Sequence, residues 1–195
     1  EEVRRALLSQ YGEDKLYGGG LSVRTTLDPV MQGHARKALA DGLVAFDRDR
    51  AEDLGVPVRL HCCQSVYEFA TVLRLRQTTP LGWLEALGLL TPRAILPHGI
   101  FLAGHPKVPV VGADDWQRLV GSGASIVHCP AVFARSGEAL DSFGRYRTAG
   151  INLGLGTDTW PPDLVHNMRL GLYVARVMEG GVTQTSMADL YSAAT

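Results

Sequence analysis

The sequence has little of what marks an exported or membrane-bound protein. Its 195 residues include three cysteines, an odd number without a repeated C-x-x-C spacing. We therefore expect no disulfide framework, and we expect the protein to reside in a reducing compartment. No apolar run approaches the roughly 20 residues of a membrane-spanning helix, and the charged start "EEVRRALLSQYGEDK" does not resemble a signal peptide. We expect a cytoplasmic protein.

The sequence also lacks a charge imbalance. The formal net charge is -1 and the pI is near 6.7. Without a basic field, neither nucleic acid nor an anionic membrane is an expected partner. The 46% of hydrophobic residues and 20% of charged residues are sufficient for one sizeable core or two small ones.

Residues 1–50 are predicted to form a helix, a strand and a second helix. The stretch "EEVRRALLSQYG" has apolar residues at helical spacing and ends at Gly12. In "GGGLSVRTTLDP" the alternation over residues 21–27 predicts a strand, which we expect to cover an exposed sheet edge. Asp28 as N-cap and Pro29 at the first helical position predict the start of the second helix.

From residue 51 onward, four apolar strand-like runs alternate with amphipathic helices, which is typical of a parallel sheet built from βα units. We expect an α/β fold, part of a (β/α)8 barrel of the TIM type. His61, His98, His128 and Asp158 stand at or just beyond the C-terminal ends of these runs. In such a barrel the loops at that end converge and carry the chemistry.

Three of these residues are candidate ligands of one metal ion. Zinc or iron prefers imidazole and carboxylate groups held on rigid elements, and His61 and Asp158 fit this description. His98 could bind the metal or orient its water. A lone histidine at a strand end is more often structural, but the repetition in "RLH", "LPH" and "GTD" favours a shared site.

The stretches "VPVRLHCCQSVYEF", "AILPHGIFLAGHP" and "GINLGLGTDTWPPDLVHNMRLGLYVARV" occur in the order and spacing of a known family. Residues 51–195 resemble the C-terminal half of the amidohydrolase superfamily, in its branch of cytosine-deaminase-like and triazine-chlorohydrolase-like enzymes. The resemblance implies that these residues supply the fifth to eighth strands of the barrel. It also implies a metal-dependent hydrolase that acts on C–N or C–Cl bonds of a small heterocyclic substrate.

The resemblance assigns a role to each strand-end residue. His61 matches a metal ligand on the fifth strand, and His98 matches the sixth-strand histidine, which binds the metal or orients its water. Asp158 matches the aspartate that touches the metal and takes the proton from the attacking water. His128 matches a seventh-strand histidine, which contacts substrate or is structural. We interpret His105 and His166 as surface residues.

Two features depart from the family pattern. The proton-shuttling acid is expected three residues after His61, where this chain has Gln64. An amide cannot donate a titratable proton, which argues against ordinary deamination, and we expect Gln64 to hydrogen-bond the substrate. Glu68 could replace the acid if it points into the pocket, although a glutamate on a solvated helix face is the other interpretation.

The second departure is that no H-x-H pair, the ligands of the family's first strand, exists anywhere in the sequence. A complete barrel needs roughly 250 residues, more than residues 51–195 provide. We therefore expect a site that is short of ligands and holds its metal weakly.

Residues 1–48 resemble a different family. The stretch "YGEDKLYGGGLSVRTTLDPVMQGHARKALADGLVAFDR" is similar to the interdomain segment of class A penicillin-binding proteins. No S-x-x-K or K-T-G motif of that family occurs, so no acylating serine is proposed. The two resemblances predict a chimeric chain with domains 1–50 and 51–195 and a seam within residues 47–51.

Three functions remain open from the sequence. The first is the metal-dependent hydrolase. The second is a catalytically inactive fragment or structural domain whose exposed strand edges and apolar core favour a homo-oligomer. The third is a cell-wall scaffold piece, which would require export.

Overall fold

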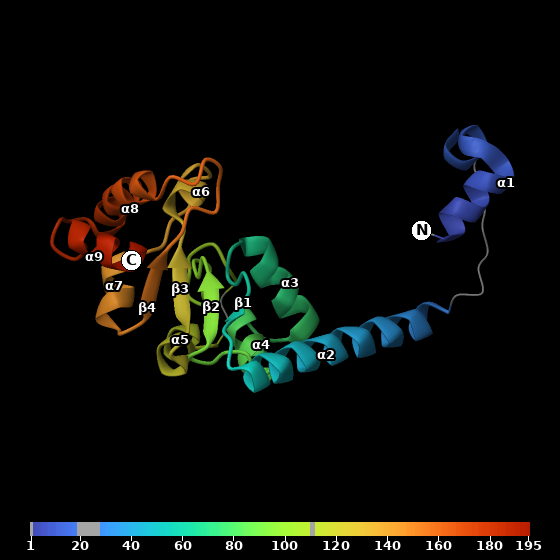
Figure 1. Ribbon diagram of the computed structural model, residues 1–195, viewed down its shortest axis with the longest axis horizontal. Helices are drawn as coiled ribbons and strands as arrows, with labels where there is room; N and C mark the ends of the chain where they lie inside the picture. Colours follow the sequence, from blue (N-terminus) through green and yellow to red (C-terminus); the bar gives the residue numbers. More distant parts are fainter. Residues whose placement is uncertain (1, 19–27, 110–111) are drawn as a thin grey trace. The chain divides into compact units, whose positions relative to one another are not determined.

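The computed structural model describes residues 2–18, 28–109 and 112–195 and divides into two compact units, Glu1–Gly42 and Leu43–Thr195 (Figure 1). We call them unit 1 and unit 2. Their elements, in chain order, are α1 Glu2–Gly18, α2 Pro29–Leu54, β1 Val58–Arg59, α3 Val66–Arg76, α4 Pro80–Ala86, β2 Ala94–Pro97, α5 Asp115–Ser122, β3 Ser125–His128, α6 Pro130–Ala134, α7 Phe143–Thr148, β4 Asn152–Leu155, α8 Leu164–Glu179 and α9 Met187–Ala194. No helix among the described residues is long and apolar enough to cross a membrane.

Unit 1 consists of helix in its described residues. Gly12 interrupts α1 with a φ of 77° and a ψ of 170°, but the helix resumes and ends at Gly18. The first helical segment thus stops at Gly12, as predicted, and a second segment that was not predicted follows it to Gly18. The predicted strand over residues 21–27 lies outside the described residues. The cap at Asp28 is confirmed, because its Oδ1 accepts hydrogen bonds from the backbone N–H groups of Val30 (2.7 Å) and Met31 (3.2 Å).

Helix α2 runs without interruption through the predicted seam. The two units divide after Gly42, whereas the seam was expected at residues 47–51, inside this helix. The apolar residues at helical spacing along α2 form a stripe that is exposed: Met31 and Leu39 by 66% and 64%, and Phe46 by 64%. This stripe therefore covers no core in the part of the chain that the structure describes.

Unit 2 contains a four-stranded sheet in the order β1-β2-β3-β4, with every neighbouring pair parallel (Figure 1). The predicted α/β fold with a parallel sheet is confirmed. That the strands are the fifth to eighth of a barrel stays a prediction.

One face of this sheet forms the core. Leu96, Ile126 and Leu153 are register partners on β2, β3 and β4, so their side chains share a face, and all three are buried. They belong to one cluster with buried side chains from the helices, namely Phe69, Leu119, Tyr146, Leu172 and Leu190. The adjacent register row has Asn152 exposed and Ser125 half-buried. Helices therefore pack on one face, and the other face is more open.

Six helices of unit 2 begin at a residue whose side chain accepts a hydrogen bond from the first turn. These N-caps are Ser65, Thr79, Asp114, Ser142, Asp163 and Ser186. Each cap fixes the residue at which the loop before its helix ends. The caps therefore also fix the lengths of the loops that follow the strands and contain the candidate site residues.

Candidate active site

The end of β1 places His61 beside the end of β2. Pairing continues past the strand, because the N–H of Cys62 donates to the carbonyl oxygen of Pro97 at 3.4 Å and Cys62 bridges His98 in parallel. His61 is exposed, whereas Cys62 and Cys63 are buried. The strand thus holds the backbone on both sides of His61 and leaves its ring free to face a neighbour.

Glu68 shapes the loop that follows His61. Its Oε1 accepts from the N–H of Cys63 at 2.9 Å and its Oε2 accepts from the N–H of Gln64 at 2.8 Å. The residue is half-buried, so its interpretation as a solvated helix-face glutamate is wrong. Its carboxylate faces backbone donors, and this position gives no support to the alternative in which Glu68 is an acid directed into the pocket.

His98 follows β2 in a left-handed backbone conformation, with a φ of 86°. Its N–H donates to the carbonyl oxygen of Val127 on β3 at 2.9 Å. The side chain is 1% exposed, and its ring packs edge-on against Phe133 of α6 with centroids 4.7 Å apart. His98 therefore lies deep in the site, between two strands and a helix.

Asp158 follows β4 in a turn with a φ of 44°. The turn stays close to β3 because the N–H of Gly156 donates to the carbonyl oxygen of His128 at 2.9 Å. A Cβ atom at Gly156 would lie 3.0 Å from Val127 and 3.1 Å from Cys129, so only glycine allows this approach without a shift. Asp158 remains 39% exposed at its side chain.

The structure brings three of the predicted site residues together. Nε2 of His98 lies 3.3 Å from Nδ1 of His61 and 3.7 Å from Oδ2 of Asp158. The two imidazole rings meet edge to face, with centroids 4.7 Å apart. Side chains separated by up to 97 positions in the sequence thus share one small volume, as the sequence predicts.

The surroundings of the two ring nitrogens of His98 indicate which of them carries the proton. Its Nδ1 is buried and has no partner among the described residues. A neutral imidazole has its proton on one nitrogen, and a buried N–H without an acceptor costs about 1–3 kcal/mol. Nε2, in contrast, faces the carboxylate of Asp158, which attracts an N–H and repels a lone pair. The proton therefore belongs on Nε2, and His98 is a hydrogen-bond donor toward the site.

The His98 ring is neutral at physiological pH. Burial lowers the pKa of His98 to about 4, the neighbouring His61 lowers it further, and Asp158 opposes both. A neutral donor can orient a water molecule or a polar atom of a substrate without adding a buried positive charge.

The environment of His128 favours its structural interpretation. The side chain is 3% exposed, and its ring centroid lies 5.9 Å from that of Phe143. Burial lowers the pKa of His128 to about 4, with a smaller contribution from His98. Contact of His128 with a substrate stays a prediction, but its burial leaves little surface for one.

The remaining predicted residues lie as follows. Gln64 Oε1 is 3.2 Å from Nδ1 of His61, so this amide contacts the ring rather than open space. His166 is exposed on α8, as predicted. His105 is half-buried against Phe101, with ring centroids 4.8 Å apart, so its interpretation as a surface residue is only partly right.

The donors present here fit a metal ion only in part. Two nitrogen ligands about 2.0–2.1 Å from a tetrahedral zinc lie roughly 3.3 Å apart, and Nδ1 of His61 lies 3.3 Å from Nε2 of His98. The same Nδ1 lies 3.2 Å from the amide oxygen of Gln64, which accepts a hydrogen bond and favours a proton on Nδ1. A nitrogen that carries a proton is not free to bind metal, however. Within residues 2–18, 28–109 and 112–195, no group of three or more His, Cys, Asp or Glu side chains is arranged to hold an ion. His61 and Asp158 remain as two candidate ligands.

Phe133 and three polar contacts of the loops were not predicted from the sequence. These contacts are those of Glu68 with the N–H groups of Cys63 and Gln64 and that of Asn167 with Ala131. The carbonyl oxygen of the Asn167 side chain on α8 accepts from the N–H of Ala131 at 3.1 Å, just after β3, and Asn167 is 1% exposed. The motif S-x-x-E at Ser65–Glu68 was the one sequence signal for a contact of this kind, since it is the pattern of a capping box.

Comparison with known sequences identifies a family over the whole chain. The profile of the amidohydrolase family matches residues 1–195. A 5-methylthioadenosine/S-adenosylhomocysteine deaminase of Natronomonas pharaonis is 27% identical over 188 residues, covering 90% of this chain and 42% of that protein. A protein of the same name from Nitratidesulfovibrio vulgaris is 30% identical over 135 residues, covering 64% of this chain and 28% of that protein. The chain therefore spans less than half the length of these relatives.

Solved structures share the fold. An adenosine deaminase from Xanthomonas campestris with bound zinc matches with a TM-score of 0.69 and 25% identity, over 80% of this chain and 34% of that one. A mutant atrazine chlorohydrolase from Arthrobacter aurescens, complexed with zinc and atraton, matches with a TM-score of 0.67 and 23% identity, over 80% and 33%. The second match concerns the fold alone. A separate origin of residues 1–48, by resemblance to penicillin-binding proteins, stays a prediction.

Proposed function

Because the chain belongs to the amidohydrolase family, we propose that it provides the His61–His98–Asp158 part of a metal-dependent hydrolase. The substrate is a small nitrogen heterocycle, and water replaces an amino or chloro substituent on a ring carbon. The names of the relatives, which are deaminases, support the amino substituent. The chloro substituent follows from the resemblance of the sequence alone.

One observation carries the proposal, namely the convergence of the three polar side chains from the ends of β1, β2 and β4. Structural histidines would have no reason to lie within 3.3–3.7 Å of each other and of a half-exposed carboxylate. His98 is buried and its pKa is lowered by burial and by His61, and groups with such shifted pKa values cluster at functional sites.

Each residue has a distinct role in this proposal. Asp158, whose side chain is partly open to solvent, accepts the proton of the attacking water as the new C–O bond forms. It passes this proton to an amino group, which departs as ammonia when the C–N bond breaks, whereas a chloro substituent departs as chloride when the C–Cl bond breaks. His98 donates from Nε2 and orients that water beside Asp158, at the 3.7 Å separation of the two side chains. Gln64, 3.2 Å from the His61 ring, fixes the orientation of that ring. This replaces the prediction that Gln64 bonds to the substrate.

A divalent metal, zinc or iron, would be held by His61 and Asp158. When bound, it lowers the pKa of water and polarises the ring carbon that is attacked. Gln64 Oε1 contacts Nδ1 of His61 at 3.2 Å and so orients the ring, as hydrogen-bond partners of ligand histidines usually do. Nε2 of His61 would then be the nitrogen that binds the metal.

A catalytically inactive domain is the second candidate. The missing third ligand among the described residues and the amide at position 64 favour it. This alternative predicts that the folded chain retains no zinc after dialysis and hydrolyses no substrate.

A metal-retention and turnover experiment separates the two. The chain is loaded with zinc, dialysed and analysed for metal by inductively coupled plasma mass spectrometry. Ammonia release from 5-methylthioadenosine and chloride release from atrazine are then measured. We expect partial zinc retention and one of the two activities in the original chain and in His166→Ala, an exposed control. Both should be lost in Asp158→Ala. A folded, zinc-loaded chain that retains no metal would contradict the proposal.

The expected homo-oligomer stays a prediction. In the described part of unit 2, β1 and β4 each pair on one side only, and such edges favour association. Native mass spectrometry of the same samples would report the mass of the assembly.

A further inference from the structure

The His98 ring lacks the support that functional histidines usually have. A second-nitrogen hydrogen bond normally fixes the orientation of such a ring, but Nδ1 of His98 has no partner among the described residues. The backbone conformation of His98 is also one that non-glycine residues rarely adopt, with a φ of 86°. Conformations of this kind persist only where the surroundings determine them. What holds the backbone of His98 therefore contributes to the orientation of the ring, beside its packing against Phe133 and His61.

The loop after β1 holds the first residues beyond His98. The N–H of Gly99 donates to the carbonyl oxygen of Cys62 at 3.1 Å. The N–H groups of Ile100 and Phe101 both donate to the carbonyl oxygen of Cys63, at 3.0 and 2.9 Å. These bonds fix the segment on the side of β1 but leave the carbonyl oxygen of Gly99 unused.

Tyr146 of α7 holds the opposite side. Its hydroxyl donates to the carbonyl oxygen of Gly99 at 2.9 Å, across 47 positions of sequence. The tyrosine is 2% exposed, and its ring packs edge-on against Trp116 with centroids 4.9 Å apart. Burial raises the pKa of Tyr146, so the hydroxyl remains a donor at all ordinary pH values.

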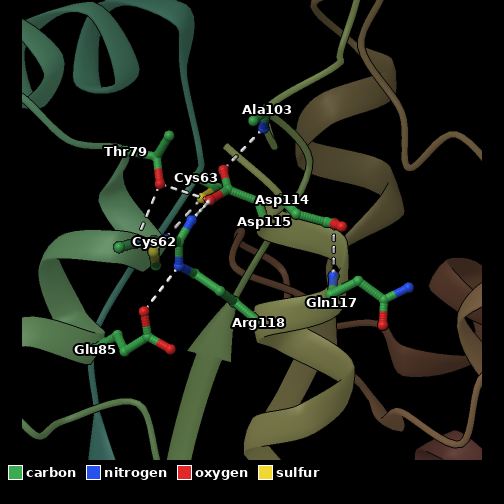
Figure 2. A network of polar contacts seen from close by, with 10 residues as sticks. Cys62, Cys63, Thr79, Glu85, Ala103, Asp114, Asp115, Gln117 and Arg118 are labelled. Atoms are coloured by element: carbon green, nitrogen blue, oxygen red, sulfur yellow. Dashed lines mark hydrogen bonds and ion pairs between the residues drawn. The ribbon is translucent and has the colours of Figure 1, made fainter. Parts of the chain in front are cut away.

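Asp115 of α5 holds the far end of the segment, as Figure 2 shows. Its Oδ2 accepts from the N–H of Ala103 at 2.8 Å, and its Oδ1 accepts from the hydroxyl of Thr79 at 2.5 Å. Asp115 is fully buried. The Arg118 guanidinium lies 3.7 Å from Oδ1 and bonds to Glu85 at 2.8 Å. Thr79, at the start of α4, and Arg118 of α5 thus hold the carboxylate that binds the N–H of Ala103.

We propose that Tyr146 and Asp115 are positioning residues for His98, which hold its imidazole against His61 and Asp158 by clamping residues 99–103. The placement of the ring follows from the geometry alone, whereas its consequence for catalysis rests on the proposed function. Neither residue touches the reacting groups, and both act through the backbone.

Two conservative substitutions test the clamp. Tyr146→Phe removes only the hydroxyl, and Asp115→Asn removes one acceptor while keeping the size of the side chain. Tyr191→Phe on an exposed residue and Asp114→Asn on the neighbouring N-cap are the matched controls. Long-range proton–nitrogen spectra of the His98 ring, recorded at one fixed pH, report its tautomer and mobility. We expect shifted, broadened or doubled ring signals in both test variants and unchanged signals in both controls.

Kinetics provide the second measurement. A displaced catalytic group lowers turnover much more than substrate binding, so we expect kcat to fall about tenfold or more and KM to change little in Tyr146→Phe. A purely structural role would lower the melting temperature and leave the His98 signals and kcat unchanged, and that result would overturn the proposal. If the original chain has no activity, the proposed function fails, and the ring spectra alone decide whether the clamp exists.

Discussion

The two units show different relations between a helical sequence and a core. In unit 1, apolar residues at helical spacing remain exposed, including Val30 and Leu39, both by 64%. In unit 2, the equivalent residues are buried: Phe69 on α3, Leu119 on α5 and Leu190 on α9 have no exposed surface. Periodicity of apolar residues therefore predicts a helix in both units, but only a sheet in contact with that helix makes the pattern a source of stability.

The largest expected effect contrasts one leucine from each unit. Leu96→Ala, at the centre of the sheet face, removes a fully buried side chain and should lower the free energy of unfolding by about 2–5 kcal/mol. Leu39→Ala on α2 removes an exposed side chain and should change it by less than about 0.5 kcal/mol. Urea denaturation followed by circular dichroism measures both. A comparable loss in the two variants would mean that α2 is covered in solution.

The second effect is a loss of stability in acid that arises in unit 2. Burial lowers the pKa of His98 and of His128 to about 4 from an ordinary value of 6.5. As the pH falls, the unfolded chain binds protons at these two histidines at a higher pH than the folded chain does. The free energy of unfolding is therefore unaffected by them above pH 6.5 and decreases as the pH falls toward 4. Each histidine should contribute about 2–3 kcal/mol of destabilisation by pH 4.5.

Urea denaturation at pH 7.5 and at pH 4.5 tests this dependence. His128→Gln should reduce the difference between the two pH values, whatever its effect on stability at pH 7.5. His166→Ala, on an exposed residue of the same unit, should leave the difference unchanged. An unaltered difference in His128→Gln would show that His128 is protonated in the folded state.

The third effect concerns the carboxylate that holds the loop after β1. Glu68→Gln keeps one acceptor oxygen but replaces the other by a donor, which cannot bind the N–H of Cys63 or Gln64. A loss of about 1–3 kcal/mol is expected for a bond to a charged group, together with faster amide exchange at those two residues. Glu13→Gln, on an exposed glutamate of α1, should alter neither quantity. Equal exchange rates in both variants would contradict the role of Glu68.

The sequence was sufficient for the sheet and for the three site residues, because each strand is a short apolar run that ends in a polar group. His61, His98 and Asp158 could be predicted to converge, since the C-terminal ends of parallel strands lie at one edge of a sheet. The predicted seam within residues 47–51 lies inside α2, which continues to Leu54, and the division into domains 1–50 and 51–195 stays a prediction.

The residues that orient the loops of the site could not be predicted from the sequence, because they lie far along the chain from the residues that they contact. Tyr146 reaches Gly99, and Asn167 reaches Ala131, across 47 and 36 positions. No local sequence pattern indicates a contact between residues that are so far apart in the chain. Glu68 was within reach of sequence reasoning through its capping-box spacing, but its partners are the two residues before the cap rather than the cap itself. Tertiary structure thus decided which polar side chains orient the loops.

The smallest effect should distinguish local from tertiary control of structure. Gly12 breaks α1 with a φ of 77°, and a Cβ atom there would meet nothing within 4 Å. In Gly12→Ala, the preference of alanine for helical φ, about 1 kcal/mol over glycine, should convert the break into continuous helix. Far-ultraviolet circular dichroism should show a slight gain in helix, while the urea midpoint of the sheet unit stays unchanged because Gly12 is exposed and is not a member of the core cluster. A shift of that midpoint would mean that the two units fold as one, and the contrast between them would no longer hold.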